Sequence, residues 1–434
     1  MSYLAIVVTI LSISTSSWAQ NQCVCPTSDD DLSTLKSVFI LMRHGIRAPW
    51  TTYPLDPFAA NNSQRFPNGG SQLTDAGIDQ AYNMGRYYQQ RYGKFIDENP
   101  KSAFLRASAA QRCIDTLSIV AKKLWPPTVD NKKQWQPMIF SLPQKIDSIL
   151  YEEPDCEHAE EEEQKNLKTP EVQAYEADPK IQELYKFTKE KTGLKADMYS
   201  VTKAFDCIRC EKLNGLQSPD WATPVIYDRM GDVLSQRLNF FYKSTKAQRL
   251  RAGPILEDFK KNMDNVINAK ATDKPKKVFI YTSHDFKIAS VLSALGDPQP
   301  KYPPFAAAII LELHKIGDKN IVRALYVNQT VNWPYTAIKL PLTKCQVKAG
   351  NPQKPDTLVK HIAKDISSTL KKLSPIELPK FGANKTTGPG AKDCTFENFV
   401  NSIADLTPVD WRSECGLDCK YDPFKSAEDN LGQT

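Results

Sequence analysis

The chain has 434 residues, 41% of them hydrophobic, and its 56 basic and 50 acidic residues leave a net charge of +6. This length can bury a large core and leaves room for two subdomains. The charge is small for the length and gives no reason to expect nucleic-acid binding, and after residue 19 no run approaches the ~18 apolar residues of a transmembrane segment.

The first 19 residues have the features of a secretory signal peptide. Residues 4–13 form an apolar run, and residues 17–19 supply the small side chains that a signal peptidase requires. All ten cysteines follow this segment, and an even number of cysteines on an export route favours disulfides. We therefore expect a secreted or lumenal protein, the lysosome included. Three glycosylation sequons agree with export and begin at Asn61, Asn328 and Asn384.

A six-residue run at 37–42, apolar after its first serine, predicts a buried strand. It ends at a charged group of Arg43, His44 and Arg47, and Pro49 closes the group, so these charges lie where the strand gives way to a loop. A guanidinium offers a rigid fork of donors that matches phosphate oxygens and stays charged at any working pH. The end of the first strand therefore predicts an anion site.

The following segments repeat the order of strand, arginine and helix. A helix is predicted over residues 75–92, with Thr74 as its N-cap. Residues 103–105 then lead into Arg106, and a second helix follows as far as Leu124. Such units in series predict an α/β fold with a mostly parallel central sheet flanked by helices.

Residues 147–245 change in character, because they are polar and mostly helical in pattern. A helical stretch inside an α/β chain predicts an inserted cap subdomain over the edge of the sheet. The α/β pattern returns with a strand over residues 277–283, and His284 and Asp285 stand at its end. The sequence predicts further strands and core segments at residues 306–313 and 322–327, with the whole α/β core spanning about 33–146, 246–343 and 394–420.

Residues 344–393 hold ten lysines against four acidic residues, and this excess equals the net charge of the whole chain. Leucine and isoleucine recur every four residues from Leu358 to Leu370, which predicts one amphipathic helix. The lysines either bind a membrane or an acidic glycan or simply form a solvated face.

Cys207 and Cys210 have the spacing of half a zinc site. No second pair with a histidine follows at metal-ligand distance, so disulfide bonding is the favoured interpretation. We expect no metal and no cofactor.

Charged side chains thus follow three separate predicted strands. Ligands of open α/β sheets bind beyond the carboxyl ends of the strands, so these side chains are expected to meet around a phosphate group. Histidine can form a covalent phosphohistidine, fixed guanidinium groups stabilise the phosphoryl group, and a carboxylic acid can protonate the leaving alkoxide. The expected site consists of Arg43, His44, Arg47, Arg106, His284 and Asp285.

Residues 43–49 resemble the signature of the histidine acid phosphatases, a branch of the histidine phosphatase superfamily. The resemblance extends in order over nearly the whole mature chain, residues 20–434. It is carried by the segments 53–57, 72–77, 219–223, 283–285, 294–296, 303–304, 312–314 and 410–415.

The resemblance implies a role for each residue of the site. His44 would be the phosphorylated nucleophile, and Asp285 would be the proton donor to a small phosphate monoester. Family members have an α/β sheet with a helical cap, many form dimers, and most prefer acidic pH, so a homodimer is a further expectation. The residues that would bind the phosphate are Arg43, Arg47, Arg106 and His284.

The resemblance also implies two disulfides. Relatives place two cysteines close together where Cys345 and Cys394 stand, so residues 346–393 are an expected insertion closed at its base by a disulfide between them. Cys156 is expected to pair with Cys415. Phe286 and Lys287 follow the His-Asp pair where most relatives have Thr or Asn, and we expect Lys287 to face outward. No pairing is assigned to Cys23, Cys25, Cys113, Cys207, Cys210 and Cys419.

The main hypothesis is therefore a secreted acid phosphatase. A phytase or inositol-polyphosphate phosphatase shares the motif and would be marked by a more basic pocket. A phosphoglycerate-mutase-like transferase fits export and disulfides less well. A secreted binding protein that has lost turnover is a fourth alternative, and the complete set of site residues argues against it.

Overall fold

A computed structural model describes residues 32–126, 137–270, 272–297, 299–346 and 394–417. The expected signal peptide and nearly all of the expected lysine-rich insertion lie outside these ranges, as do Asn384, Cys23, Cys25 and Cys419. Within them, no helix is long and apolar enough to span a bilayer.

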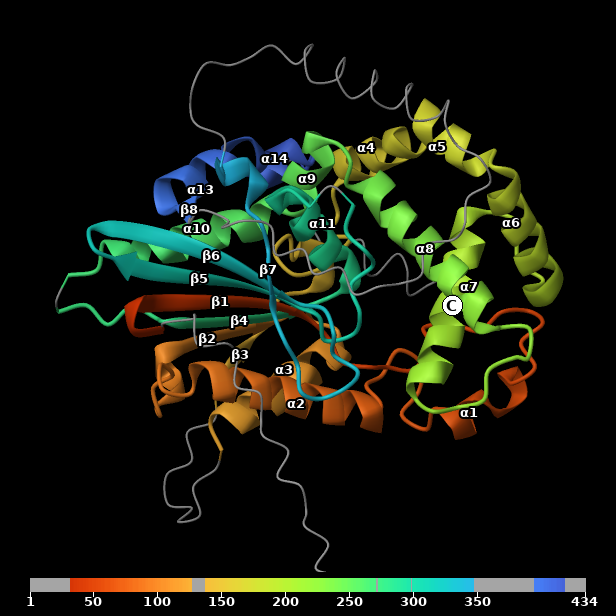
Figure 1. Ribbon diagram of the computed structural model, residues 1–434, viewed down its shortest axis with the longest axis horizontal. Coiled ribbons are helices and arrows are strands. Elements are labelled where there is room, and N and C mark those ends of the chain that lie inside the picture. The colour runs from red at the N-terminus through yellow and green to blue at the C-terminus, as the bar shows by residue number, and fades with distance from the viewer. Residues whose placement is uncertain (1–31, 127–136, 271, 298, 347–393, 418–434) are drawn as a thin grey trace, which may run out of the picture. The chain divides into compact units, whose positions relative to one another are not determined.

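An eight-stranded sheet forms the centre of the described chain (Figure 1). The strand order is β3-β2-β4-β1-β5-β6-β7, and β8 pairs with β6. The strands are β1 (Leu35–Arg43), β2 (Ala103–Ala107), β3 (Ile139–Phe140), β4 (Val278–Ser283), β5 (Ala308–Ile316), β6 (Lys319–Val327), β7 (Ile338–Lys339) and β8 (Cys394–Thr395).

The sheet is mixed, and the expectation of a mostly parallel sheet is therefore wrong. The strands β1, β2, β3 and β4 pair with one another in parallel. The strands β5, β6, β7 and β8 make only antiparallel pairs, including the pair of β5 with β1. β5 and β6 are joined by Gly317 and Asp318 alone, and the glycine has a positive φ of 56°. A parallel pair needs a crossover of a dozen or more residues, so this short turn forces a hairpin.

Helices cover both faces of this sheet (Figure 1). Four of the α-helices outside residues 147–245 are short: α1 (Asn62–Arg65), α9 (Thr245–Arg251), α13 (Phe396–Ile403) and α14 (Trp411–Glu414). The longer ones are α2 (Asp75–Tyr92), α3 (Gln111–Leu124), α10 (Gly253–Ile267) and α11 (Asp285–Leu295).

Alternate residues of β1 contribute to two different cores. Val38, Ile40 and Met42 pack on the face covered by α2 and α3. Phe39 and Leu41 pack on the opposite face with α10, α11 and α13. The strand is apolar throughout because both of its faces are buried.

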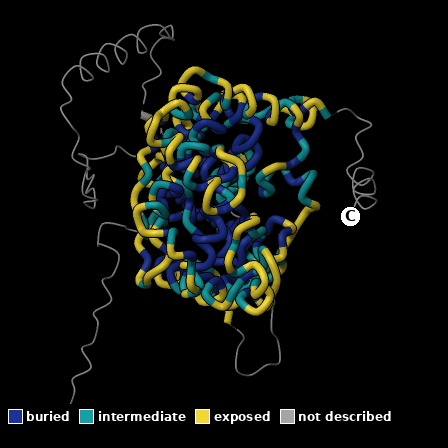
Figure 2. Tube along the Cα trace, turned by 90° about the vertical axis from the view of Figure 1, so that its right-hand side faces the viewer, coloured by how far each residue is buried: buried dark blue, intermediate teal, exposed yellow. Residues whose placement is uncertain are grey.

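Residues 147–245 contain helices and none of the strands described. Phe205, Ile208, Met230 and Val233 form the centre of a separate apolar core, and Ala289 of α11 joins it. Across the described chain, buried segments lie in the interior and exposed segments surround them (Figure 2). The helices are α4 (Glu157–Leu167), α5 (Pro170–Glu176), α6 (Pro179–Thr192), α7 (Met198–Leu213) and α8 (Pro224–Phe241).

The structure contains both expected disulfides. Cys156, at the start of α4, pairs with Cys415 at a Cα distance of 4.5 Å. Cys345 pairs with Cys394 at a Cα distance of 5.9 Å, and these two residues bracket the lysine-rich segment. Each disulfide thus joins parts of the chain that are far apart in sequence.

Cys207 and Cys210 are free thiols, so the expectation of disulfide bonding is wrong for them. Both are buried on α7, where each sulfur contacts the loop after β1. The Cys207 thiol donates to the carbonyl of Thr51 at 2.8 Å, and Cys210 Sγ lies 3.6 Å from Arg47 Nη1. Cys113 is also a buried free thiol.

Lys287 is buried rather than facing outward, which corrects a second expectation. Its ammonium group donates to the carbonyls of Arg251 at 2.6 Å and Ser148 at 3.1 Å. Burial, with the nearby charge of Arg251, lowers the pKa of Lys287 to about 7. The side chain joins α11 to the segments before α4 and α10.

Replacing both Cys156 and Cys415 by serine should lower the free energy of unfolding by about 2–5 kcal/mol, because a disulfide that closes a long loop restricts the unfolded chain. The bond spans 259 residues. Denaturant unfolding followed by circular dichroism measures the change. Reductant should destabilise the wild type more than the double variant, which keeps only the disulfide between Cys345 and Cys394. Equal unfolding midpoints for wild type and variant would contradict the prediction.

Candidate active site

The two predicted histidines lie side by side because their strands are neighbours. β1 and β4 pair in parallel with Arg43 opposite Ser283, so His44 and His284 follow at the same end of the sheet. The backbone amide of His44 donates to the carbonyl of Ser283 at 3.0 Å. The two buried imidazole rings meet edge to face, with their centroids 5.6 Å apart.

The loop after β1 lies directly on the start of α2. A Cβ at Gly77 would come within 2.0 Å of the Ile46 carbonyl oxygen, and one at Gly45 within 2.7 Å of the Gly77 carbonyl oxygen. The Thr74 hydroxyl accepts from the amide of Gly77 at 3.4 Å and donates to the Ile46 carbonyl at 3.2 Å. The predicted helix cap therefore also fixes the loop that carries His44.

The hydrogen bond of His44 determines which ring nitrogen is available for chemistry. Nδ1 lies 2.9 Å from the carbonyl oxygen of Gly45, and a carbonyl can only accept, so Nδ1 carries the proton. Burial, and then the charges of Arg112 and Arg43, hold the pKa of His44 well below its usual value. The ring is therefore neutral, and Nε2 has a free lone pair.

Arg43 is fully buried and has three partners. Nη1 donates to the carbonyl of Pro303 at 2.7 Å, and Nη2 lies 2.8 Å from a carboxylate oxygen of Asp285. The guanidinium carbon lies 4.0 Å from the centroid of the Phe305 ring. Burial lowers the pKa of Arg43 to about 10 against the opposing effect of Asp285, so the group stays charged below that pH.

Arg47 is bound by Asp206, a residue of α7 that the sequence did not identify. Nη1 and Nη2 of Arg47 donate to the two carboxylate oxygens at 3.1 and 3.0 Å. Arg209 on the same helix donates to Asp206 at 3.0 Å. Burial would raise the pKa of Asp206, but Arg47 and Arg209 outweigh it and lower the pKa to about 2. This carboxylate connects the helical part to the loop after β1.

Asp285 is the first residue of α11 and lies between two guanidinium groups. Besides Arg43, Arg209 Nη2 lies 3.8 Å from its carboxylate. Burial would raise the pKa of Asp285, but Arg43 and Arg209 outweigh burial and hold the pKa below its usual value. Without a bound anion, Asp285 is therefore ionised.

Arg106 does not join this group. Phe104 and Arg106 point to the face of β2 opposite that of Leu105 and Ala107, whose side chains pack toward α3. The Arg106 guanidinium instead donates to Asp147 at 2.6 Å. Its expected place among the phosphate-binding residues is not supported by this geometry.

Arg112 takes the position that was expected for Arg106. It lies on the first turn of α3, and its Nη2 is 3.1 Å from Nδ1 of His284. A guanidinium can only donate, so Nδ1 of His284 accepts and its Nε2–H donates to the hydroxyl of Ser108 at 2.9 Å. Arg112 follows Arg106 by six residues, and its position at the start of a helix after a strand could have suggested it.

Arg209 and the ring of Phe305 also belong to this cluster and were not predicted from the sequence. The guanidinium carbons of Arg43 and Arg209 lie 4.0 and 4.7 Å from this ring, and that of Arg47 lies 5.7 Å away. An aromatic face attracts cations, so Phe305 helps to hold the like charges together. No pattern around Phe305 or Arg209 indicated this role.

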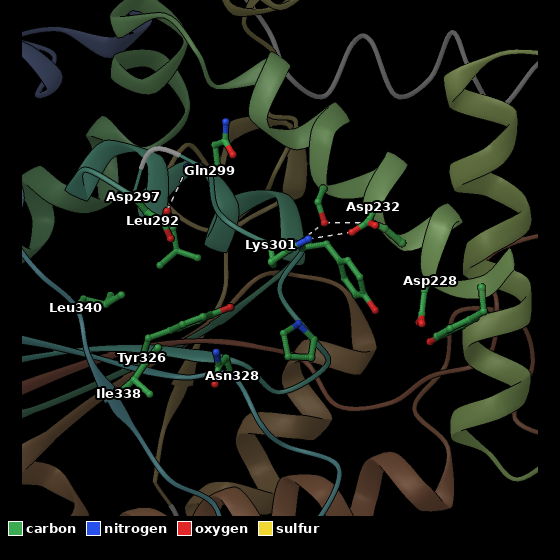
Figure 3. Close-up of a pocket in the computed structure, with 15 residues that line it drawn as sticks. Asp228, Asp232, Leu292, Asp297, Gln299, Lys301, Tyr326, Asn328, Ile338 and Leu340 are labelled. Atoms are coloured by element: carbon green, nitrogen blue, oxygen red, sulfur yellow. Dashed lines mark hydrogen bonds and ion pairs between the residues drawn. The ribbon is translucent and has the colours of Figure 1, made fainter. Parts of the chain in front are cut away.

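A cavity of about 590 Å³ lies beside this cluster, between α8 and the ends of β6 and β7 (Figure 3). Tyr302 lines the cavity and also packs on the guanidinium of Arg209, 5.5 Å from the ring centroid. Lys301 and Asp232 form an ion pair of 2.9 Å at its wall, and Asn328 of a predicted sequon also lines it. Tyr302 therefore separates this cavity from the charged cluster.

In the described part of the chain, no group of three or more histidine, cysteine, aspartate or glutamate residues could hold a metal ion. The groups that meet at the strand ends are guanidinium groups, neutral imidazoles and carboxylates paired with guanidinium groups.

Residues 34–327 match the sequence profile of the histidine phosphatase superfamily (branch 2). The chain belongs to this family. It is 28% identical to prostatic acid phosphatase of Homo sapiens over 398 residues, which cover 88% of each chain. Lysosomal acid phosphatase of Homo sapiens is 27% identical over 316 residues, which cover 69% of this chain and 73% of that protein.

Among solved structures, a phytase of Hafnia alvei in complex with tartrate superimposes with a TM-score of 0.61. Its sequence is 15% identical, and the match covers 88% of this chain and 98% of that one. This likeness concerns the fold. Together with the relatives, the family makes the chain a hydrolase, an acid phosphatase.

Arg112→Ala should lower kcat/KM for a phosphate monoester by about 10²–10³-fold, because removal of one preorganised donor has effects of this size. Arg106→Ala should leave kcat/KM close to that of wild type but reduce stability, by about 3–5 kcal/mol, since Asp147 would be buried without its partner. Steady-state kinetics and denaturant unfolding separate the two effects. A larger kinetic loss for Arg106→Ala than for Arg112→Ala would contradict this assignment.

Proposed function

We propose that the chain hydrolyses phosphate monoesters through a covalent phosphohistidine on His44. The observation that carries this proposal is the neutral His44 ring, whose Nδ1–H donates to Gly45 while Nε2 keeps its lone pair among guanidinium groups. In the first step Nε2 attacks phosphorus and the ester P–O bond breaks. In the second step a water oxygen attacks phosphorus and the P–N bond breaks.

Arg43, Arg47 and Arg112 bind the phosphate group in this proposal, and His284 binds it once Arg112 turns to the phosphate and Nδ1 takes up a proton, which the negative charge of the phosphate favours. Fixed guanidinium groups stabilise the charge of the transferred phosphoryl group without reorganising. Arg112 replaces Arg106 in this set, because its guanidinium contacts His284.

Asp285 is the proton donor to the leaving alkoxide in the proposal. It is ionised while it neutralises Arg43, but a phosphate that binds Arg43 supplies the negative charge instead. The pKa of Asp285 then rises, and acidic solution keeps it protonated. The same carboxylate takes up the proton of the attacking water in the second step.

Export to the lumen or exterior of the cell is part of the proposal. The expected signal peptide, the two disulfides and the similarity to a lysosomal acid phosphatase support it. Glycosylation at Asn61 and Asn328, and a homodimer, remain proposals that follow from the sequence.

His44→Ala should lower kcat by about 10⁴-fold or more, because loss of a covalent nucleophile removes the two-step route. Wild-type protein quenched rapidly with denaturant, without acid, should carry a phosphate on the peptide that contains His44. His158→Ala is a matched control, because this half-buried histidine contacts the carbonyl of Glu414 instead. Full activity of His44→Ala would disprove the mechanism.

Hydrolysis of an aryl phosphate should persist in the presence of a chelator and should be faster at about pH 5 than at pH 7, because Asp285 must hold a proton. The same assay with phytate tests the alternative of an inositol-polyphosphate phosphatase. Folded protein that binds phosphate but turns over neither substrate would favour the secreted binding protein.

A further inference from the structure

Glu152 lies beside the phosphate site and has no role in the mechanism above. One carboxylate oxygen lies 3.9 Å from Nδ1 of His284. The other oxygen, Oε2, is buried and has no hydrogen-bond partner. The side chain is 22% exposed, so water reaches only a small part of it. A buried carboxylate oxygen without a partner is costly if the group is ionised.

The loop that carries Glu152 is held in place by the residues behind it. Asp147 binds Arg106 and also accepts from the amides of Ile149 and Leu150 at 3.2 and 3.0 Å. The Ser283 hydroxyl donates to the carbonyl of Leu150. Arg106 therefore does not contact the site directly. Through Asp147 it holds the segment that places Glu152 against His284.

Several charged and titratable groups surround Glu152. Burial, and then the negative charges of Asp285 and Glu153, raise the pKa of Glu152 to about 8, and Arg112 and Arg43 oppose this shift. The groups that face it from the neighbouring elements are Tyr151 and Glu153 on its own loop, Arg112 and Cys113 on α3, Arg43 on β1, His284, Asp285 and Lys287 at the start of α11, and Tyr242 after α8.

The charge balance of the site depends on Glu152. Arg43, Arg47 and Arg209 pair with the carboxylates of Asp206 and Asp285, and a fourth guanidinium group, that of Arg112, contacts His284. The site therefore holds four guanidinium groups against these two carboxylates. While Glu152 is neutral, the excess of positive charge matches a phosphate dianion. An ionised Glu152 would remove one positive charge and would lie nearest to Arg112 and His284, two of the proposed phosphate ligands.

We propose that Glu152 is a positioning residue that competes with phosphate for Arg112 and His284. When Glu152 holds a proton, these two groups are free to bind a phosphate monoester. When Glu152 is ionised, it is an internal anion that attracts the Arg112 guanidinium and repels the substrate. The inference rests on the proposed function for its substrate class, and it adds a reason why the site should lose affinity for phosphate in alkaline solution.

The direction in which phosphate affinity changes with pH follows from the raised pKa of Glu152. The carboxyl is neutral in acid and at neutral pH, and it ionises as the pH rises through about 8. Phosphate affinity should therefore be unaffected by Glu152 in acid and should fall above that pH, by about tenfold for each further pH unit. The change should appear in KM and in the affinity for inorganic phosphate, whereas kcat should change little.

The experiment measures the dissociation constant of inorganic phosphate by calorimetry from about pH 5 to 9.5, a range that includes the ordinary and the shifted pKa. It compares wild type with Glu152→Gln, which keeps the shape of the neutral carboxyl and cannot ionise. Turnover is not needed, so the result does not depend on whether the proposed hydrolysis occurs. Comparison at each pH cancels the ionisation of phosphate itself.

The expected result is equal affinity of the two proteins in acid, with Glu152→Gln binding phosphate about tenfold more tightly at pH 9. Glu153→Gln is the matched control, because it removes the same charge from the neighbouring exposed position of the loop. Glu152→Ala should flatten the pH dependence in the same way, provided that circular dichroism shows a folded protein.

Three outcomes would overturn the inference. The first is a ratio of wild-type to Glu152→Gln affinity that does not change with pH. The second is an equal effect of Glu153→Gln, which would point to overall charge. The third is no phosphate binding by either protein at any pH, which would overturn the phosphate site itself. Phosphate binding without hydrolysis, in contrast, would overturn only the proposed function.

Discussion

The burial of several guanidinium groups in one small volume is the constraint on which the site depends. Arg43 is fully buried, so water does not solvate its charge. Arg47 and Arg209 lie with Arg43 around the ring of Phe305. Asp206 and Asp285 offset part of this charge and leave a positive excess. Like charges in a medium of low polarity repel strongly, so the arrangement is most stable with an anion bound. In the proposed function, the phosphate group of the substrate is the anion that completes this electrostatic balance.

The same surroundings determine where protons are held. Both histidines are neutral, because burial and neighbouring guanidinium groups lower their pKa values. Asp285 and Glu152 are carboxyl groups of one site with opposite shifts: paired with Arg43, Asp285 is ionised, whereas Glu152 has an unpartnered buried oxygen and keeps its proton. Groups whose pKa values are pushed apart can serve different functions at one pH. In the proposed mechanism, His44 is thus neutral and able to attack in acid, while Asp285 gains a proton only when the phosphate replaces it on Arg43.

The sequence predicted the elements that local patterns encode. The apolar run of β1, the cap at Thr74 and the convergence of His44 with His284 follow from periodicity, capping chemistry and the geometry of parallel strands. The sequence did not predict features that depend on the direction in which a side chain points. Arg106 lies within β2 instead of after it, and the alternation of side chains along the strand turns it away from the site. The sequence alone did not specify which face of β2 would be turned toward the histidines. The burial of Lys287 between backbone carbonyls likewise depends on distant segments that local patterns do not reveal.

The helical part and the α/β part are joined by ion pairs of Asp206 and Arg209 with Arg47 and Asp285 of the proposed phosphate site. Asp206 and Arg209 lie three residues apart on α7, so they share one face of the helix, and that face points at the loop after β1. A substitution on this face changes the charge balance of the phosphate site and the attachment of the helices together. Asp228 and Asp232 on α8 are exposed, line the cavity beside the charged cluster and meet neither condition. Under the proposed function, phosphate recognition therefore depends on residues that also hold the fold together, whereas the cavity-lining residues of α8 are not under this constraint.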